Sequence, residues 1–396
     1  MGLLVAQVLN AFGAGLFYPF ALLYFTTVTE LTVARVGLIL TVATLISLTV
    51  TPMTGILVDR FGAKRFVVLS QCLEAIGFAL YAGVHSSIGL VIAAILTTAG
   101  TRMYYASFSA FIAEIALPET RDQWYGVVGV IQSLAGTASG ALVAILVSFV
   151  GMESFRVFVA GTALCLGLCA VFYGRQRDGS WRHEVRTENA GGFDVVLRDC
   201  AYMGVVGANG LLMLSTLMTS LGLSVYVTQT LQAPLWIVGV IGVLQTLLVV
   251  TLQGRLLVRI QHRRRTQIMI GASLIWVGSF LGYAFVAQLP MLLVVPSLVL
   301  IAGLMIFAQM AYAPTARSLA AGAGRSGLQG RYIAMFELSW GVASASAPSL
   351  FGLLFSWQPV VPWMAMAIMS AIAAGLLRWS GRRLSPEADR AGHCDG

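Results

Sequence analysis

Residues 55–65 read Gly-Ile-Leu-Val-Asp-Arg-Phe-Gly-Ala-Lys-Arg and form a short charged segment between two long apolar runs. A degenerate copy, Gly-Arg-Leu-Leu-Val-Arg-Ile-Gln-His-Arg-Arg, occupies residues 254–264, which is 199 positions later in a chain of 396 residues. A repeat at about half of the chain length indicates duplication of a whole domain. A charged loop at matching positions in two apolar halves marks equivalent ends of two membrane-embedded repeats.

The composition predicts an all-α integral membrane protein. Hydrophobic residues make up 58% of the chain and charged residues 10%, whereas soluble domains average roughly 25% charged residues. The apolar runs are about 20 residues long, as helical spans require, and barrel strands would instead give alternating segments of about 10. We predict twelve spans, at residues 3–28, 36–58, 66–84, 88–113, 126–150, 157–174, 201–227, 236–254, 266–286, 292–313, 332–354 and 362–379.

The basic residues predict the orientation of these spans. Of 24 basic residues, 21 lie in the loops after the even-numbered spans or beyond the twelfth span. Only Arg35 and Arg156 lie on the opposite side, and Arg102 lies within a span. Because arginine and lysine accumulate in cytoplasmic loops, both termini are expected in the cytoplasm. Anchoring at anionic headgroups also accounts for the net charge of +8, so no nucleic-acid partner is expected.

The polar segments divide the chain into four parts. Residues 1–174 are predicted to form an N-terminal six-helix bundle and residues 201–379 a C-terminal six-helix bundle, related by pseudo-symmetry. Residues 175–200, which contain charges of both signs, are predicted to be a cytoplasmic linker, and residues 380–396 a cytoplasmic tail. Five cysteines and four histidines form no ligand pattern, so we expect no metal site and no cofactor.

Three ionisable residues, Glu74, Arg102 and Glu337, are predicted to lie within the membrane, where charges are costly and often functional. The depths of Glu74 and Arg102 differ by only ~5 Å at a helical rise of about 1.5 Å per residue, so an ion pair is feasible. Coupling of protons or substrate through Arg102 is the other interpretation. Glu337 is our first candidate for a proton site, and membership of a cytoplasmic charge network is its alternative.

The segment at residues 55–65 resembles the loop signature of the major facilitator superfamily, Gly-x-x-x-Asp-Arg-x-Gly-x-Lys/Arg-Lys/Arg. The resemblance implies two six-helix bundles around a central cavity that alternate between inward-open and outward-open states. It further implies that this loop and a nearby acidic residue latch the outward-open state. The latch residues are then Gly55, Asp59, Arg60, Gly62, Lys64, Arg65 and Glu114.

Within that superfamily the chain resembles the twelve-span drug/proton antiporters. Arg102 matches an arginine embedded in their fourth span, although Tyr105 and Ala106 stand where Gln-Gly commonly follows. Gly129, Gly136 and Gly140 resemble the spaced glycines of their fifth span.

In this family the first, fourth, seventh and tenth spans line the cavity. The substrate-site candidates drawn from these and neighbouring spans are aromatic or neutral and polar, which suits amphiphilic compounds better than multiply charged anions. They are Asn10, Tyr18, Tyr104, Tyr105, Phe108, Gln132, Asn209, Thr216, Gln309 and Tyr312.

The leading functional hypothesis is a secondary transporter that exports small amphiphilic compounds, such as drugs or secondary metabolites, with a proton gradient as its energy source. The alternative transporter is a proton-coupled importer of a sugar, an organic acid or another small nutrient. A membrane enzyme or receptor on the same fold is disfavoured, because the sequence contains no Walker loop and no nucleophile elbow. We expect a monomer in the bacterial cytoplasmic membrane that contacts small-molecule substrates and membrane lipids.

Overall fold

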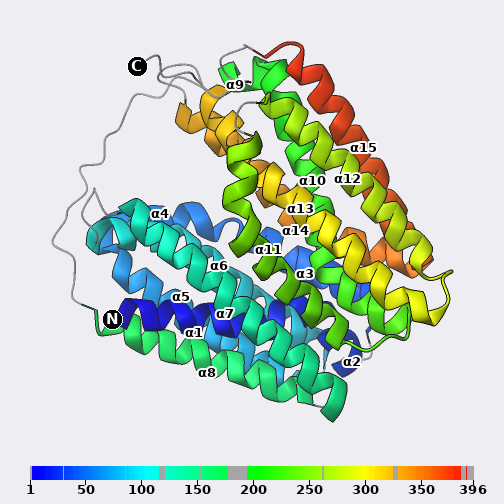
Figure 1. The fold of residues 1–396 in the computed structure, drawn as a ribbon. Coiled ribbons are helices and arrows are strands. Elements are labelled where there is room, and N and C mark those ends of the chain that lie inside the picture. Colours follow the sequence, from blue (N-terminus) through cyan, green and yellow to red (C-terminus); the bar gives the residue numbers. More distant parts are fainter. Residues whose placement is uncertain are drawn as a thin grey trace. The chain divides into compact units, whose positions relative to one another are not determined.

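The computed structural model describes residues 2–29, 31–84, 86–115, 121–151, 154–176, 194–260, 263–323, 329–384 and 389, and the regular elements within these ranges are helices. The chain divides into two compact units. The first contains residues 1–186 and 221–243, and the second contains residues 187–220 and 244–396. Figure 1 shows the helices of both units as ribbons.

The first unit is built mainly from the N-terminal half of the chain. Its elements are α1 (Gly2–Phe17), η1 (Tyr18–Phe20), α2 (Ala21–Val28), α3 (Val33–Ser47), α4 (Val50–Phe61), α5 (Ala63–Ala82), α6 (Ser87–Ile115), α7 (Arg121–Val150) and α8 (Phe155–Gly174). Residues 221–243 join this unit. The Ser224 hydroxyl donates to the carbonyl oxygen of Pro19 at 3.1 Å, and the backbone N–H of Trp236 donates to the Ser148 hydroxyl at 2.9 Å.

The second unit contains most of the C-terminal half. The helices of this half are α9 (Asp194–Arg198), α10 (Cys200–Val225), η4 (Tyr226–Thr230), α11 (Trp236–Ile260), α12 (Arg265–Val286), α13 (Met291–Ala323), α14 (Gln329–Trp357) and α15 (Val361–Gly381). The end of α10, all of η4 and the start of α11 belong to the first unit, and the rest belongs to the second. Asp199 links α9 and α10 to α14, because its carboxylate accepts from the N–H of Tyr202 and from the hydroxyl of Tyr332, both at 3.0 Å.

Eleven helical segments among the described residues are long and apolar enough to span a membrane. The predicted span at residues 36–58 is not among these eleven, so the twelfth span is not confirmed. The chain there is divided into α3, which ends at Ser47, and α4, which begins at Val50. Pro52 has no N–H to donate to the carbonyl of Leu48, so the regular ladder fails at this point although the sequence stays apolar.

Proline also interrupts the first span. Helix α1 ends at Phe17, and a 3-10 turn over Tyr18–Phe20 precedes α2. Pro19 lies within that turn, where its missing N–H removes a helical hydrogen bond. The segment Gly2–Val28 is still long and apolar enough to cross a membrane, as expected for residues 3–28.

The two units repeat one packing arrangement. In the first unit α5 packs against α6 and α8, and in the second unit α12 packs against α13 and α15. Helices α5 and α12 each follow one copy of the charged segment with which the sequence analysis began. The repeat in the sequence therefore corresponds to a repeat in helix packing.

Glycines allow α5 and α6 to approach closely. A Cβ atom on Gly100 would lie 2.6 Å from Cγ of Glu74 and 2.9 Å from the carbonyl oxygen of Ser70, and one on Gly77 would lie 2.9 Å from the backbone nitrogen of Thr97. These separations are too short for real atoms, and two of the three contacts are with backbone. Small residues at such positions are typical of membrane helices in close contact.

We expect Gly100→Ala to destabilise the protein by about 1–3 kcal/mol, because overpacking forces backbone shifts. The matched control is Gly271→Ala in α12, where a Cβ atom would meet nothing within 4 Å. There the higher helix propensity of alanine should leave stability unchanged or raise it by up to ~1 kcal/mol. Thermal unfolding of the purified proteins in detergent measures both effects, and equal midpoints for the two variants would contradict the close approach.

Candidate functional site

The charged loop at residues 55–65 turns sharply between α4 and α5. Its turn residue is Gly62, with φ 84° and ψ 147°, and the N–H of Gly62 donates to the carbonyl of Val58 at 2.8 Å. A residue with a side chain is strained in this conformation, so glycine is needed here for a steric reason. The backbone of the loop thus explains one position of the signature.

The other predicted latch residues are only partly described. The Lys64 ammonium donates to the carbonyl oxygen of Gln176, just beyond the end of α8, and the Arg60 guanidinium lies 5.2 Å from the ring centroid of Phe61. Arg65 is exposed. The surroundings of Gly55 and the side chains of Asp59 and Glu114 lie outside what the structure describes, so the latch stays a prediction.

Among the described residues of the first unit, Glu74 carries a buried carboxyl group, with 5% of its surface exposed. It lies on α5 against Gly100 of α6, and the Thr101 hydroxyl is a neighbouring polar group. That hydroxyl also donates to the carbonyl of Thr97 at 2.9 Å and lies 3.2 Å from the hydroxyl of Tyr18. Glu74, Thr101 and Tyr18 therefore form a continuous polar chain from α5 through α6 to η1.

The sequence analysis considers an ion pair between Glu74 and Arg102 feasible, because the two residues lie at similar depths in the membrane. Thr101, the residue before Arg102, lies beside Glu74. Successive residues in a helix point about 100° apart, so Arg102 points in a different direction from Thr101. The ion pair stays a prediction.

A second polar cluster lies deep in the first unit. The Gln7 amide donates to the hydroxyls of Tyr104 and Tyr173 at 2.8 and 2.7 Å, and these hydroxyls lie 3.3 Å apart. The Phe108 ring stacks on Tyr104 with centroids 5.0 Å apart. Tyr104 and Phe108, predicted as cavity residues, are thus buried in the packing of α1, α6 and α8.

Two asparagines that differ by 199 in residue number lie on α1 and α10 and bind different neighbouring helices. The Asn10 amide on α1 donates to the Gln71 side chain on α5 at 3.0 Å. In the second unit, Asn209 on α10 donates to the Ser339 hydroxyl at 2.8 Å and accepts from the Tyr312 hydroxyl at 2.9 Å. Both asparagines were cavity candidates, and each is engaged in hydrogen bonds between helices of its own unit.

The remaining candidates differ in accessibility. Tyr18 is 40% exposed and Tyr105 61% exposed, and Gln132 is also exposed. Thr216 donates to the carbonyl of Leu212 within α10, and Oε1 of Gln309 is buried without a hydrogen-bond partner in the part of the chain that is described. Glu337 is exposed near the start of α14. None of these observations tests contact with a substrate.

Sequence reasoning missed several polar residues that complete these clusters, namely Gln7, Gln71, Thr101, Tyr173 and Ser339. The spacing of polar residues on α1 and α5 could have identified some of them. Gln7 and Asn10 are three residues apart on α1, and Gln71 and Glu74 are three apart on α5, so each pair shares one helix face. Polar faces at matching positions on two apolar helices indicate hydrogen bonds between those helices.

Comparison with known proteins places these features in a family. The family model of the Major Facilitator Superfamily matches residues 3–328. The chain is a member of this superfamily. Among its relatives is the multidrug resistance protein MdtH of Escherichia coli (strain K12 / DH10B), which is 25% identical over 337 residues, covering 82% of this chain and 80% of that protein. MdtH of E. coli O9:H4 (strain HS) gives the same identity and coverage.

Solved structures of superfamily transporters show the same fold. The nucleoside transporter NupG superimposes with a TM-score of 0.76 at 14% identity, covering 97% of this chain and 99% of that one. The xylose transporter XylE from E. coli gives a TM-score of 0.72 at 13% identity, covering 95% and 94%. As a superfamily member, the protein is a multi-pass transporter of the cell membrane that moves small molecules and is not an enzyme.

We expect Tyr312→Phe to lower the free energy of unfolding by about 1–3 kcal/mol, because it removes the hydroxyl that donates to the buried Oδ1 of Asn209. Tyr105→Phe is the matched control, and its exposed hydroxyl should change stability by less than about 0.5 kcal/mol. Thermal unfolding of both variants checks the difference. A Tyr312→Phe protein as stable as Tyr105→Phe would show that the bond contributes little.

Proposed function

We propose that this transporter exports small amphiphilic compounds, such as drugs or secondary metabolites, by alternating access driven by proton entry. The relationship to proteins named for multidrug resistance supports export and the substrate class. The observation that carries proton coupling is Glu74, a carboxyl group 5% exposed within the apolar first unit. An ionisable group at membrane depth is costly and is typical of proton pathways.

The Thr101 hydroxyl can serve the Glu74 carboxyl group in both of its protonation states. The Thr101 hydroxyl has a single hydrogen, and it donates that hydrogen to the carbonyl oxygen of Thr97. With its hydrogen on that carbonyl the hydroxyl can accept from a protonated Glu74, and with the hydrogen turned it can donate to a carboxylate, so the arrangement accommodates both states of the carboxyl group. Burial favours the protonated state, because that state avoids the cost of a buried charge.

Tyr18 gives this buried group a route to the outside of the unit. Its hydroxyl contacts Thr101 at 3.2 Å, and 40% of its surface is exposed. Loss of the proton from Glu74 would free Thr101 to turn its hydrogen towards the carboxylate. A change of protonation can thereby alter the contact between η1 and α6, beside the proline that interrupts the first span.

Glu337 and Arg102 are the other coupling candidates. Glu337 is exposed on α14, whereas Glu74 is buried, so we place the proton first on Glu74. Arg102 remains charged at all physiological pH values and interacts with Tyr105. We assign Arg102 to substrate or conformational coupling and the proton itself to Glu74.

The decisive variant is Glu74→Gln, which keeps a donor for Thr101 but cannot release a proton. In proteoliposomes we expect dye export driven by a pH gradient to fall to the level of protein-free vesicles. Exchange of labelled for unlabelled dye, which needs no net proton movement, should persist. Retained exchange would separate a coupling defect from misfolding.

Glu337→Gln is the matched control for this experiment, because it removes a carboxylate from an exposed position. It should retain gradient-driven export. If Glu74→Gln also exported dye with full sensitivity to the gradient, the proton role of Glu74 would be refuted. Loss of gradient-driven export in Glu337→Gln alone would assign the proton site to Glu337 on α14.

The direction of transport needs its own test in cells. Expressing cells are given amphiphilic dyes, antibiotics, sugars and organic acids, with and without a protonophore. We expect lower accumulation of dyes and antibiotics that is reversed by the protonophore, since the gradient sets net flux. Gradient-dependent gain of a sugar or organic acid, with no effect on dyes, would instead establish the importer.

A further inference from the structure

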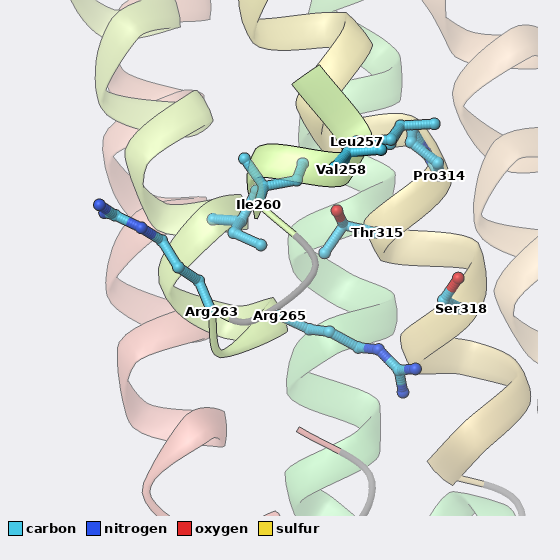
Figure 2. A pocket seen from close by; sticks show the side chains of 9 residues that line it. Leu257, Val258, Ile260, Arg263, Arg265, Pro314, Thr315 and Ser318 are labelled. Carbon is cyan, nitrogen blue, oxygen red and sulfur yellow. The ribbon is translucent and has the colours of Figure 1, made fainter. Parts of the chain in front are cut away.

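A pocket of about 320 Å³ opens in the second unit where α11, α12 and α13 meet (Figure 2). It is formed by the last turn of α11, Arg263, the start of α12 and a segment of α13. The polar residues of its lining are Arg263, Arg265, Thr315 and Ser318. The remaining lining is apolar and consists of Leu257, Val258, Ile260, Ile268 and Pro314.

The pocket lies at one end of three candidate spans. The α11 span ends at Ile260, the α12 span begins at Arg265, and the α13 span ends at Ala320. The arginine distribution predicts that this end faces the cytoplasm. Anionic phospholipid headgroups lie at this depth, and basic pockets between helices on this side of a membrane bind them.

Arginine and hydroxyl groups give the pocket donors suited to phosphate. In Figure 2 the Arg263 and Arg265 side chains extend on opposite sides, and Arg265 reaches towards α13, which presents Ser318. A guanidinium group binds phosphate oxygens through two parallel N–H donors. The nearby Asp389 carboxylate accepts from the N–H and hydroxyl of Thr266 at 2.9 and 3.0 Å, so it caps α12.

The repeat explains why an anion is tolerated here. Val258 lines the pocket and is the residue that stands, 199 positions later, where the first copy of the charged segment has Asp59. A carboxylate at this position would repel a phosphate, and the second copy lacks it. It also has arginine at residues 263 and 264, the positions of Lys64 and Arg65, and arginine offers the planar donor pair that lysine does not.

We propose that this pocket binds the phosphate of an anionic phospholipid headgroup, with Arg265 on the phosphate, Arg263 adding positive charge at the rim and the apolar wall against the adjoining lipid. A soluble phosphate compound shares the charge but would leave Leu257, Ile260 and Ile268 without an apolar partner. The volume is at the lower end of small-molecule sites, which run from roughly 300 to 1,000 Å³, and suits a headgroup.

The test is a thermal-shift titration of the full-length protein in detergent micelles doped with phosphatidylglycerol or phosphatidylcholine. A ligand of the folded state raises the unfolding midpoint with concentration, which gives an apparent affinity. We expect phosphatidylglycerol to stabilise the wild type more than phosphatidylcholine. Replacing both pocket arginines, R263Q with R265Q, should weaken that apparent affinity roughly tenfold or more.

The charge-matched control is R259Q with R264Q, which removes two exposed arginines that flank the pocket in sequence but do not line it. This pair should keep most of the phosphatidylglycerol effect. Equal losses in the two double variants would overturn the proposal in favour of diffuse electrostatic attraction. Equal stabilisation by phosphatidylcholine, or by glycerol 3-phosphate without lipid, would overturn the anionic lipid as ligand.

A second pair of variants tests the proposal even if the arginine variants fail to fold. Val258 is 64% exposed, so V258D and V258N should both fold. V258D restores the carboxylate of the first copy and should abolish the phosphatidylglycerol shift, whereas V258N should retain it. Identical shifts in the two would contradict a phosphate beside residue 258.

Discussion

The buried carboxyl group of Glu74 needs a polar partner inside the first unit. Inside a bundle of apolar helices no bulk water can satisfy such a group, so its hydrogen-bond partner must come from a neighbouring helix. That requirement depends on Gly100, whose missing side chain lets α6 approach Glu74 and bring Thr101 beside it. Close packing and the position of the ionisable group are therefore one feature of the α5 and α6 pair.

The sequence was sufficient for the membrane class, the repeat and most spans, because each rests on windows of about 20 apolar residues. It was insufficient at residues 36–58, where hydropathy is continuous and the backbone is not. Pro52 was visible in that window, and its missing N–H is the cause of the break. Hydropathy measures transfer from water and carries no information about a single lost backbone donor.

The site was harder to predict because it depends on helix rotation. Tyr104 and Tyr105 are adjacent and chemically identical, yet Tyr104 is 3% exposed and Tyr105 is 61% exposed. The same rotation points Thr101, which lies beside Glu74, and Arg102 in different directions. Membrane depth follows from residue number alone, whereas the face of a helix follows from its neighbours, which one sequence does not specify.

The two repeats keep their packing and have diverged in chemistry. At the offset of 199 residues, Ser273 stands in place of Glu74 and Trp276 in place of Gly77. The Ser273 hydroxyl donates to the carbonyl of Met269 within its own helix at 2.8 Å, so it needs no partner from α13.

Trp276 supplies the contact with α13 in the second unit. Its indole N–H donates to the carbonyl of Met305 at 3.2 Å, and its ring lies 5.3 Å from that of Tyr312. The interface of α12 and α13 is thus filled by a large side chain where that of α5 and α6 is closed by glycine. Among the described residues, the α5 and α6 interface therefore combines close approach with a buried acid, Glu74, whereas the α12 and α13 interface has Ser273 at the equivalent position.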